Sequence, residues 1–415
     1  MTALDAIIQD LQAMEDPWGS FLGHVDLADQ ARARTTLQHG AAGLLLFDRY
    51  VGASRADALE LERAHRDALF QALAHEPLPP WLFDGVAGLG WVLAHRLRAG
   101  HEENLDLAEL DDLLLTYLSK AGESIPFELI AGRVGLGLYF LERLPVAKAR
   151  EGAEAIVASL ERSVESRPDG LTWRTVADWM EPKAARVLSQ GLWNLGVSHG
   201  VPGVIGFLAR CAEEKISSPE CRRLLAGAIP WLLGQRNPPD AARAFPFFSS
   251  DGGRSEETRL GWCYGEVGIA AVLIRAGTAI GVDEWVSEGL DLALRAAAAS
   301  FEHAFVDEPS LCHGAAGLLH SFNRMGQALN EPRLLDAGRR WFDHTLDFFR
   351  PGKGLGGFDY LHAYSRTERF SVPGLLIGSA GVGLALHAAI QGEVEPNWDR
   401  VFLLDLPLSR RGQQP

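Results

Sequence analysis

Two of the four cysteines in the chain stand in short motifs that could bind a metal ion. Cys263 lies in the run GWCYGEVG, and Cys312 lies in SLCHGAAG, where His313 follows it directly. Thiolate sulfur and imidazole nitrogen are ligands that Zn²⁺ prefers, and three protein ligands leave the fourth tetrahedral position open, as in catalytic zinc sites. These three residues therefore predict a zinc site at which a substrate thiol could bind.

A cysteine or a Cys-His pair in isolation is more often a small buried residue than a metal ligand. The place of Cys263 and Cys312 within a repeat favours the ligand interpretation. Cys211 and Cys221 lie in the amphipathic segments FLARCAEEK and SSPECRRLL, and we expect them to be unliganded thiols. Four cysteines in 415 residues are too few for a disulfide scaffold.

The repeat is a Gly-x-x-Gly motif followed by an apolar residue, and it occurs seven times. The first glycines of the seven copies are Gly40, Gly85, Gly132, Gly200, Gly265, Gly314 and Gly378. Successive differences between these numbers are 45, 47, 68, 65, 49 and 64, so each unit has room for two helices and a loop of variable length. The three long intervals must carry insertions.

Each motif opens an apolar segment such as GIAAVLIRAG, which is typical of a helix surrounded by neighbours. Segments between motifs are more amphipathic, with one apolar stripe predicted to consist of Val286, Leu290, Leu294 and Ala297. Seven such helix pairs can bury all their apolar faces if they close into a ring. The sequence thus predicts an all-α fold, an α/α toroid of seven inner and seven outer helices. It would form a single domain over residues 1–415, with motifs from about 40 to 387 and short loop or strand insertions at the rim.

The residue before each first glycine should point toward the axis of such a ring. His39, Asp84, Ala131, His199, Tyr264, His313 and Ile377 occupy these positions. Cys263 and Cys312 each stand one residue earlier, at equivalent places in two repeats, which supports their interpretation as ligands. His39 and Asp84 could extend a polar lining or simply be solvated.

Three elements together resemble the signatures of lanthionine synthetase C proteins: WCYG, CHG and the histidine-glycine element in NLGVSHGVPG. The resemblance runs from about Gly40 to His387. It implies a toroid with a central Zn²⁺ that acts on a dehydrated precursor peptide carrying a leader. Such an enzyme adds peptide cysteines to dehydroalanine or dehydrobutyrine, forming lanthionine or methyllanthionine rings. A separate dehydratase and an exporter would be its partners, and the chain would be a stand-alone cyclase.

The residues suit this chemistry. A thiolate on zinc stays deprotonated yet nucleophilic at neutral pH. Its addition to the alkene produces an enolate, which needs a proton donor near the α-carbon. His199, whose counterpart in the family is similarly placed, is the leading acid/base candidate. The alternative is a histidine merely hydrogen-bonded at a helix start.

Three further residues are candidates for the catalytic site. Arg259 stands four residues before Cys263, where the family also has an arginine, and could stabilise the enolate or form a structural ion pair. Tyr264 could contact substrate, fix a ligand or fill the ring axis. Glu128, in FELIAGRVGLG, stands where the family usually has an aspartate. The glutamate side chain is one methylene longer than an aspartate side chain. Glu128 could therefore still orient His199 or Arg259, but from a changed distance.

Charge and hydropathy exclude other classes. The formal net charge of −15 argues against binding a nucleic acid backbone. No uncharged apolar run is long enough to span a bilayer, and the N-terminus lacks the basic region and cleavage site of a signal peptide. We therefore expect a cytoplasmic protein that is not integral to a membrane, although a membrane-associated biosynthetic complex could hold it at its periphery.

Other functions remain open. The same zinc site could add glutathione or another small thiol to dehydrated residues, or the ring could be a non-catalytic scaffold that binds zinc or a peptide. Glycosidases, which also use α/α toroids, need paired carboxylates, and beyond Glu128 and Asp84 nothing in the sequence offers them. A prenyltransferase would be expected to bring a carboxylate zinc ligand and a second subunit.

Overall fold

The computed structural model describes residues 2–13, 33–51, 63, 65–67, 78–98, 105–256, 258–361, 368–392 and 395–407. It divides into two compact units. The first unit combines residues 1–105, 306–399 and 407–415, and the second combines residues 106–305 and 400–406. The prediction of one domain over the whole chain stays a prediction.

Seven helices begin at the residue directly after the first glycine of a motif, as the repeat predicts. They are α4 (Ala41–Val51), α6 (Val86–Arg98), α8 (Arg133–Glu142), α11 (Val201–Glu213), α13 (Glu266–Ile280), α16 (Ala315–Leu329) and α18 (Ser379–Gln391). They are buried almost all round: all ten residues of α8 are buried, as are the first eleven of α11. This explains why their sequences are apolar on every side.

The first glycine of each motif permits a tight approach of two backbone segments. A Cβ atom on any of the seven would lie between 2.0 and 2.8 Å from the carbonyl oxygen of the residue six positions earlier. In four repeats the same carbonyl accepts a hydrogen bond from the first amide of the helix, as in Ala315 N to Glu308 O at 3.0 Å. The turn therefore satisfies a helix donor that would otherwise have no partner, and only glycine fits it.

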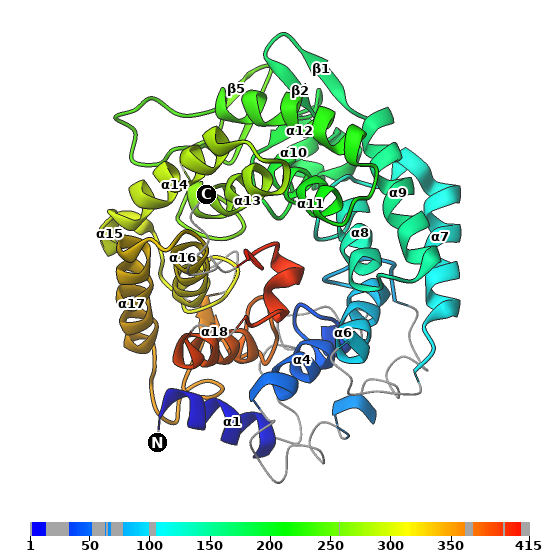
Figure 1. Cartoon of the computed structure of the whole chain (residues 1–415). Coiled ribbons are helices and arrows are strands. Elements are labelled where there is room, and N and C mark those ends of the chain that lie inside the picture. Colours follow the sequence, from blue (N-terminus) through cyan, green and yellow to red (C-terminus); the bar gives the residue numbers. More distant parts are fainter. Residues whose placement is uncertain are drawn as a thin grey trace. The chain divides into compact units, whose positions relative to one another are not determined.

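The first unit contains α4, α6, α16 and α18 with two covering helices, α1 (Ala3–Ala13) and α17 (Pro332–Asp347). The buried residues of α17, which packs on α16, recur along one face: Leu334, Ala337, Gly338, Trp341 and Thr345. Helix α1 packs against α18 (Figure 1). The last motif helix thus takes its cover from the opposite end of the chain.

The second unit contains α8, α11 and α13, and α11 packs against both of the others. Its covering helices are α7 (Ala108–Ala121), α9 (Ala147–Arg162), α12 (Ser218–Leu233) and α14 (Asp283–Ala297). Short helical segments are η2 (Gly122–Ser124), η3 (Ala177–Trp179), α10 (Pro182–Val187) and α15 (Phe301–Ala304), and η4 (Trp398–Phe402) runs from the first unit into the second.

The structure confirms the apolar stripe predicted on α14 only in part. Ala297 is buried, but Val286, Leu290 and Leu294 are only half-buried, whereas Gly289 and Ala293, each one residue earlier than Leu290 and Leu294, are buried. A Cβ on Gly289 would lie 2.8 Å from the carbonyl oxygen of Ala270 on α13. Because the two helices approach so closely, small residues form the centre of their contact and the larger residues flank it.

Short strands occupy the long intervals, as predicted. In the second unit, β1 (Glu165–Arg167) pairs with β2 (Gly170–Thr172), and β3 (Trp193–Asn194), β4 (Phe248–Ser250) and β5 (Gly253–Arg254) form an antiparallel sheet in that order. In the first unit, β6 (Tyr360–Leu361) pairs with β7 (Arg369–Phe370). Among the described residues, six covering helices accompany the seven motif helices. The segment between α4 and α6, where the seventh was expected, lies largely outside the described residues. Over the same described part of the chain, no helix combines the length and hydropathy needed to cross a membrane.

Candidate metal centre and its surroundings

Cys263 lies on the turn that opens α13, in the second unit, and is buried. The preceding residue anchors this turn: the indole Nε1 of Trp262 donates to the carbonyl oxygen of Phe402 at 2.8 Å, and the two rings meet edge to face. The carbonyl oxygen of Cys263 accepts a hydrogen bond from the amide of Ser198 at 3.4 Å. The GWCYG turn therefore rests against the turn that carries His199.

Cys312 and His313 lie on the turn that opens α16, in the first unit. Cys312 is buried, and its amide donates to the carbonyl oxygen of Leu376 at 3.0 Å. The His313 side chain is 20% exposed, and its Nε2 lies 3.4 Å from Oε1 of Glu308. Glu308 is itself buried and accepts a hydrogen bond from the hydroxyl of Ser310.

Cys263, Cys312 and His313 form a group that could hold a metal ion, since one ligand atom from each lies within 4.8 Å of the others. Neither cysteine forms a disulfide bond. Two sulfur ligands and one imidazole suit Zn²⁺ and, as three ligands, leave a coordination position for substrate. Cys211 and Cys221 are buried in α11 and α12 and do not belong to this group.

His199 is held by Glu128. Its Nδ1 lies 2.7 Å from Oε2 of Glu128, whose two oxygens also accept the backbone amides of Ile130, at 2.9 Å, and Ala131. The His199 side chain remains 47% exposed, so the edge of its ring away from Glu128 can reach a substrate. Burial disfavours the charged imidazole, but the hydrogen bond and charge of Glu128, with the charge of Cys263, outweigh it and raise the pKa of His199. The longer side chain thus still reaches the histidine.

Tyr264 is positioned by a residue that the sequence analysis did not identify, Asn194 on β3. The Asn194 amide oxygen accepts the amide of Gly196 at 2.9 Å, and this fixes its nitrogen to donate to the Tyr264 hydroxyl, also at 2.9 Å. The ring of Phe247 packs edge to face on Tyr264 at 5.1 Å between centroids, and His199 lies tilted at 6.5 Å. Tyr264 and His199 therefore face one region of the second unit.

Arg259 is half-buried, and its carbonyl oxygen is the atom that a Cβ on Gly265 would approach to 2.6 Å. Among the described residues, the Arg259 guanidinium makes no hydrogen bond or ion pair, so the structure does not bring it to Glu128. His39 is half-buried, and desolvation lowers its pKa to about 4 despite an opposing backbone hydrogen bond to Ile377. Its role in a polar lining stays a prediction.

Glu308 and Asn194 both touch residues of the candidate site, and both escaped the sequence analysis. Each stands six residues before the first glycine of its motif, the position that Arg259 occupies in a third repeat. The seven residues at this position are Arg34, Pro79, Pro126, Asn194, Arg259, Glu308 and Val372. A polar residue at this position is the sequence feature that could have identified Glu308 and Asn194.

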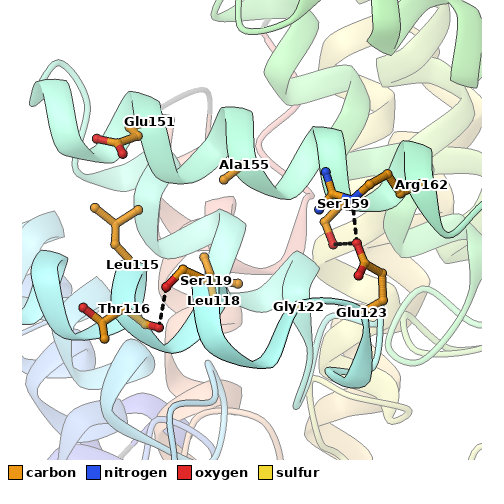
Figure 2. Close-up of a pocket in the computed structure, with 10 residues that line it drawn as sticks. All are labelled: Leu115, Thr116, Leu118, Ser119, Gly122, Glu123, Glu151, Ala155, Ser159 and Arg162. Carbon is orange, nitrogen blue, oxygen red and sulfur yellow. Dashed lines mark hydrogen bonds and ion pairs between the residues drawn. The ribbon is translucent and has the colours of Figure 1, made fainter.

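A separate pocket of about 470 Å³ lies between α7 and α9 (Figure 2). Two of its charged lining residues form an ion pair: Arg162 Nε lies 2.7 Å from Oε1 of Glu123, near the hydroxyl of Ser159. Both charged side chains are substantially exposed, so their ion pair contributes little to stability. None of the candidate site residues lines this pocket.

Comparison with known proteins gives a matching family model and solved structures to which the chain is similar. The family model described as lanthionine synthetase C-like protein matches residues 32–403. The solved structure of nisin cyclase aligns with a TM-score of 0.73 and 17% identity, covering 92% of this chain and 96% of that chain. A glycosyl hydrolase family 88 structure from Bacteroides vulgatus, with a TM-score of 0.42, 9% identity and coverage of 97% and 96%, is too dissimilar to carry an argument. The match to nisin cyclase confirms the predicted α/α toroid fold class.

Proposed function

Because the chain belongs to the lanthionine synthetase C-like family, we propose that it is a zinc-dependent cyclase of dehydrated peptides. It would add cysteine thiols to dehydroalanine or dehydrobutyrine and so form lanthionine or methyllanthionine rings. The observation that carries this proposal is the convergence of Cys263, Cys312 and His313, a donor set suited to catalytic zinc. The similar solved structure is named nisin cyclase, and the proposed reaction type follows from that name.

Cys263 and Cys312 would hold the zinc ion as thiolates and His313 as a neutral imidazole. A zinc ion held by these three residues would supply Lewis acidity, which would lower the pKa of a substrate thiol and keep its sulfur available as a nucleophile. The sulfur forms a bond to the β-carbon of the dehydrated residue while the alkene electron pair moves toward the carbonyl oxygen. The protein must then deliver one proton to the α-carbon.

His199 would deliver that proton from Nε2, because Nδ1 is engaged with Glu128. The carboxylate favours the protonated imidazole and fixes the ring, so the exposed edge of His199 carries the transferable proton. After transfer, the neutral imidazole keeps its Nδ1 proton toward Glu128. The proton released by the substrate thiol balances the one that His199 gives up, and the reaction is neutral overall.

Tyr264 and Arg259 would stabilise the enolate oxygen. Asn194 directs its amide at the Tyr264 oxygen, so the phenol is held in one orientation at the edge of the site. Arg259 has no recorded ion pair among the described residues, which leaves its charge available for a substrate group. Charge stabilisation by such pre-oriented groups is often a large part of catalysis.

The proposed substrate is a dehydrated precursor peptide with a leader. A separate dehydratase would supply it, since cyclisation consumes the alkene that dehydration of serine or threonine produces, and an exporter would take the product. The proposed location is the cytoplasm, where a membrane-associated complex could hold the protein at its periphery.

The zinc site is tested by metal analysis of the purified chain. We expect about one zinc per wild-type chain by elemental mass spectrometry and its loss in Cys312→Ala. Cys211→Ala, which removes a buried thiol outside the group, is the matched control and should keep the metal. A folded wild-type protein without zinc would contradict the proposal.

The reaction is tested with a dehydrated peptide that contains one cysteine. Cyclisation leaves the peptide mass unchanged but removes its free thiol, so the product resists alkylation by N-ethylmaleimide. When glutathione is present, addition of this small thiol would instead raise the mass by one glutathione. A protein that binds zinc but leaves the thiol of several such peptides free would be a scaffold.

A further inference from the structure

Glu308 stands five residues before His313 in the run EPSLCHG, on the other arm of the turn that opens α16. We propose that Glu308 is a positioning residue for the metal: it orients the imidazole of His313 so that Nδ1 binds the ion. This inference rests on the proposed zinc site and names how the chain prepares one of its ligands.

The carboxylate of Glu308 is buried in an unusual setting. The residue is 1% exposed, yet among the described residues no arginine or lysine pairs with it, and its Oε2 has no hydrogen-bond partner. Several other buried carboxylates of this chain pair with an arginine, such as Glu266 with Arg243. A buried carboxylate is costly unless it meets a positive charge or several donors.

The charge that faces Glu308 comes from His313. Its Nε2 lies 3.4 Å from Oε1 of Glu308, slightly beyond a usual hydrogen bond and close enough to tighten on metal binding. When the other ring nitrogen binds a cation, the Nε2 proton becomes a stronger donor, so the carboxylate is stabilised by the same event that it assists. A carboxylate behind a metal-bound histidine is a recurrent arrangement that fixes the ring and its tautomer.

The backbone makes Glu308 a rigid support. Its carbonyl oxygen accepts the amide of Ala315 at 3.0 Å, and a Cβ on Gly314 would lie 2.6 Å from the same oxygen. The Ser310 hydroxyl donates to the Glu308 carboxylate and fixes its orientation. Glu308 and His313 are thus the two ends of one closed turn, and the turn sets the direction from which the carboxylate meets the ring.

In a second repeat, the residue six before the first glycine also supports a residue of the candidate site. Asn194 also stands six residues before its first glycine, and its amide donates to the Tyr264 hydroxyl in the next motif. Position six before the glycine therefore supports a residue of the candidate site in two repeats by different chemistry. This recurrence supports a positioning role for Glu308 rather than a chance burial.

The test measures zinc affinity by competition with a chromogenic chelator in the full chain. Loss of a carboxylate behind a metal-bound histidine typically weakens affinity about 10–100-fold. We expect a loss in this range for Glu308→Ala and a smaller loss for Glu308→Gln, because the amide oxygen can still accept the Nε2 proton. The Gln variant keeps the shape of the side chain and serves if the Ala variant does not fold.

Asp48→Asn is the matched control. Asp48 is a buried carboxylate that contacts a histidine, His65, with 2.6 Å between oxygen and nitrogen, but neither residue belongs to the metal group. Its amide variant should keep wild-type zinc affinity. If Asp48→Asn weakened zinc binding as much as Glu308→Gln, the effect would be one of general destabilisation and the inference would be overturned.

Two other outcomes are informative. Glu308 variants that bind zinc as tightly as the wild type, while His313→Ala does not, would overturn the positioning role and leave the zinc site intact. Replacing Zn²⁺ by Co²⁺ distinguishes a Glu308 that positions His313 from a Glu308 that coordinates the metal. In Glu308→Gln the visible spectrum of Co²⁺ should keep its tetrahedral thiolate character. A changed coordination number in this variant would instead make Glu308 a ligand. A wild-type protein that binds no zinc would instead refute the proposed function.

Discussion

Gly265→Ala should disrupt the turn that carries Cys263, and the structure allows the cost to be compared with a matched site on the same helix. Gly265 has φ +91° and ψ −178°, a conformation essentially restricted to glycine. An added Cβ would also lie 2.6 Å from the carbonyl oxygen of Arg259. Gly281, at the other end of α13, has φ +74° but nothing within 4 Å of such a Cβ. Both substitutions strain the backbone, but only Gly265→Ala also places a Cβ too close to another atom.

The expected magnitudes follow from these two terms. Alanine at Gly281 should cost about 1–2 kcal/mol, the usual penalty for a left-handed residue. Alanine at Gly265 carries strain of about 1–3 kcal/mol. In addition, the Cβ and the Arg259 oxygen must separate by at least 0.4 Å, the difference between the 3.0 Å minimum and the 2.6 Å found. That displacement moves the backbone next to Cys263, so we expect zinc to be lost as well.

Urea unfolding and zinc analysis of the two variants provide the assay. Gly281→Ala should keep about one zinc and lose a small part of its stability. Gly265→Ala should be clearly less stable than Gly281→Ala and deficient in zinc. Equal stability of the two variants, with zinc retained in both, would refute the argument that close backbone approach in the glycine turn builds the site.

Three further outcomes follow from the contacts around the site. Glu128→Gln should move the alkaline limb of the pH–rate profile to lower pH, because Glu128 raises the pKa of His199 and the protonated form would then be lost earlier as pH rises. Asn194→Ala should reduce kcat up to about tenfold, the value of one hydrogen bond, while zinc content stays near one. Removing zinc with a chelator should lower the thermal midpoint and abolish ring formation, and added Zn²⁺, but not Mg²⁺, should restore both, since thiolate and imidazole ligands disfavour Mg²⁺.

The starts of the motif helices were predictable because one local requirement recurs. A tight backbone approach excludes any Cβ, so glycine appears wherever the turn is made, and Gly40 and Gly378 mark it as clearly as Gly314 does. The candidate metal group was predictable for the same reason, since the turn places Cys263 and Cys312 at equivalent positions. Sequence alone revealed these features because each depends on a few adjacent residues.

Other features depend on contacts between distant segments and leave no local pattern. Helix α1 covers α18 through contacts such as the amide of Gly356 with Asp10 at 2.7 Å, although the two residues are 346 positions apart. The register of α14 depends on how closely α13 approaches it at Gly289, which hydrophobic periodicity does not encode. Whether Glu128 could reach His199 was likewise a question of geometry, and the 2.7 Å contact answers it.

The glycine turn also explains how a structural repeat brings polar residues together at the candidate site. Closing the turn brings together the residue six before the glycine and the residue one before it, as with Glu308 and His313, while the fold constrains only the glycine itself. Gly314→Ala tests this directly. Gly314 has φ −106° and ψ −175°, which any residue adopts, but a Cβ there would lie 2.6 Å from the Glu308 oxygen and 2.2 Å from the amide nitrogen of Ser310.

The Cβ of an alanine at position 314 would therefore clash with neighbouring atoms without straining the backbone. The clash involves Glu308 and Ser310, the two residues that orient the His313 ring. We expect weakened zinc binding in competition with a chelator, restored only at higher zinc concentration because the three ligands are still present. Gly252→Ala is the control, since a Cβ there would meet only the hydroxyl of Ser250 at an ordinary 3.7 Å. Wild-type zinc affinity in Gly314→Ala would mean that the turn can open without moving its histidine, and the link between repeat and site would fail.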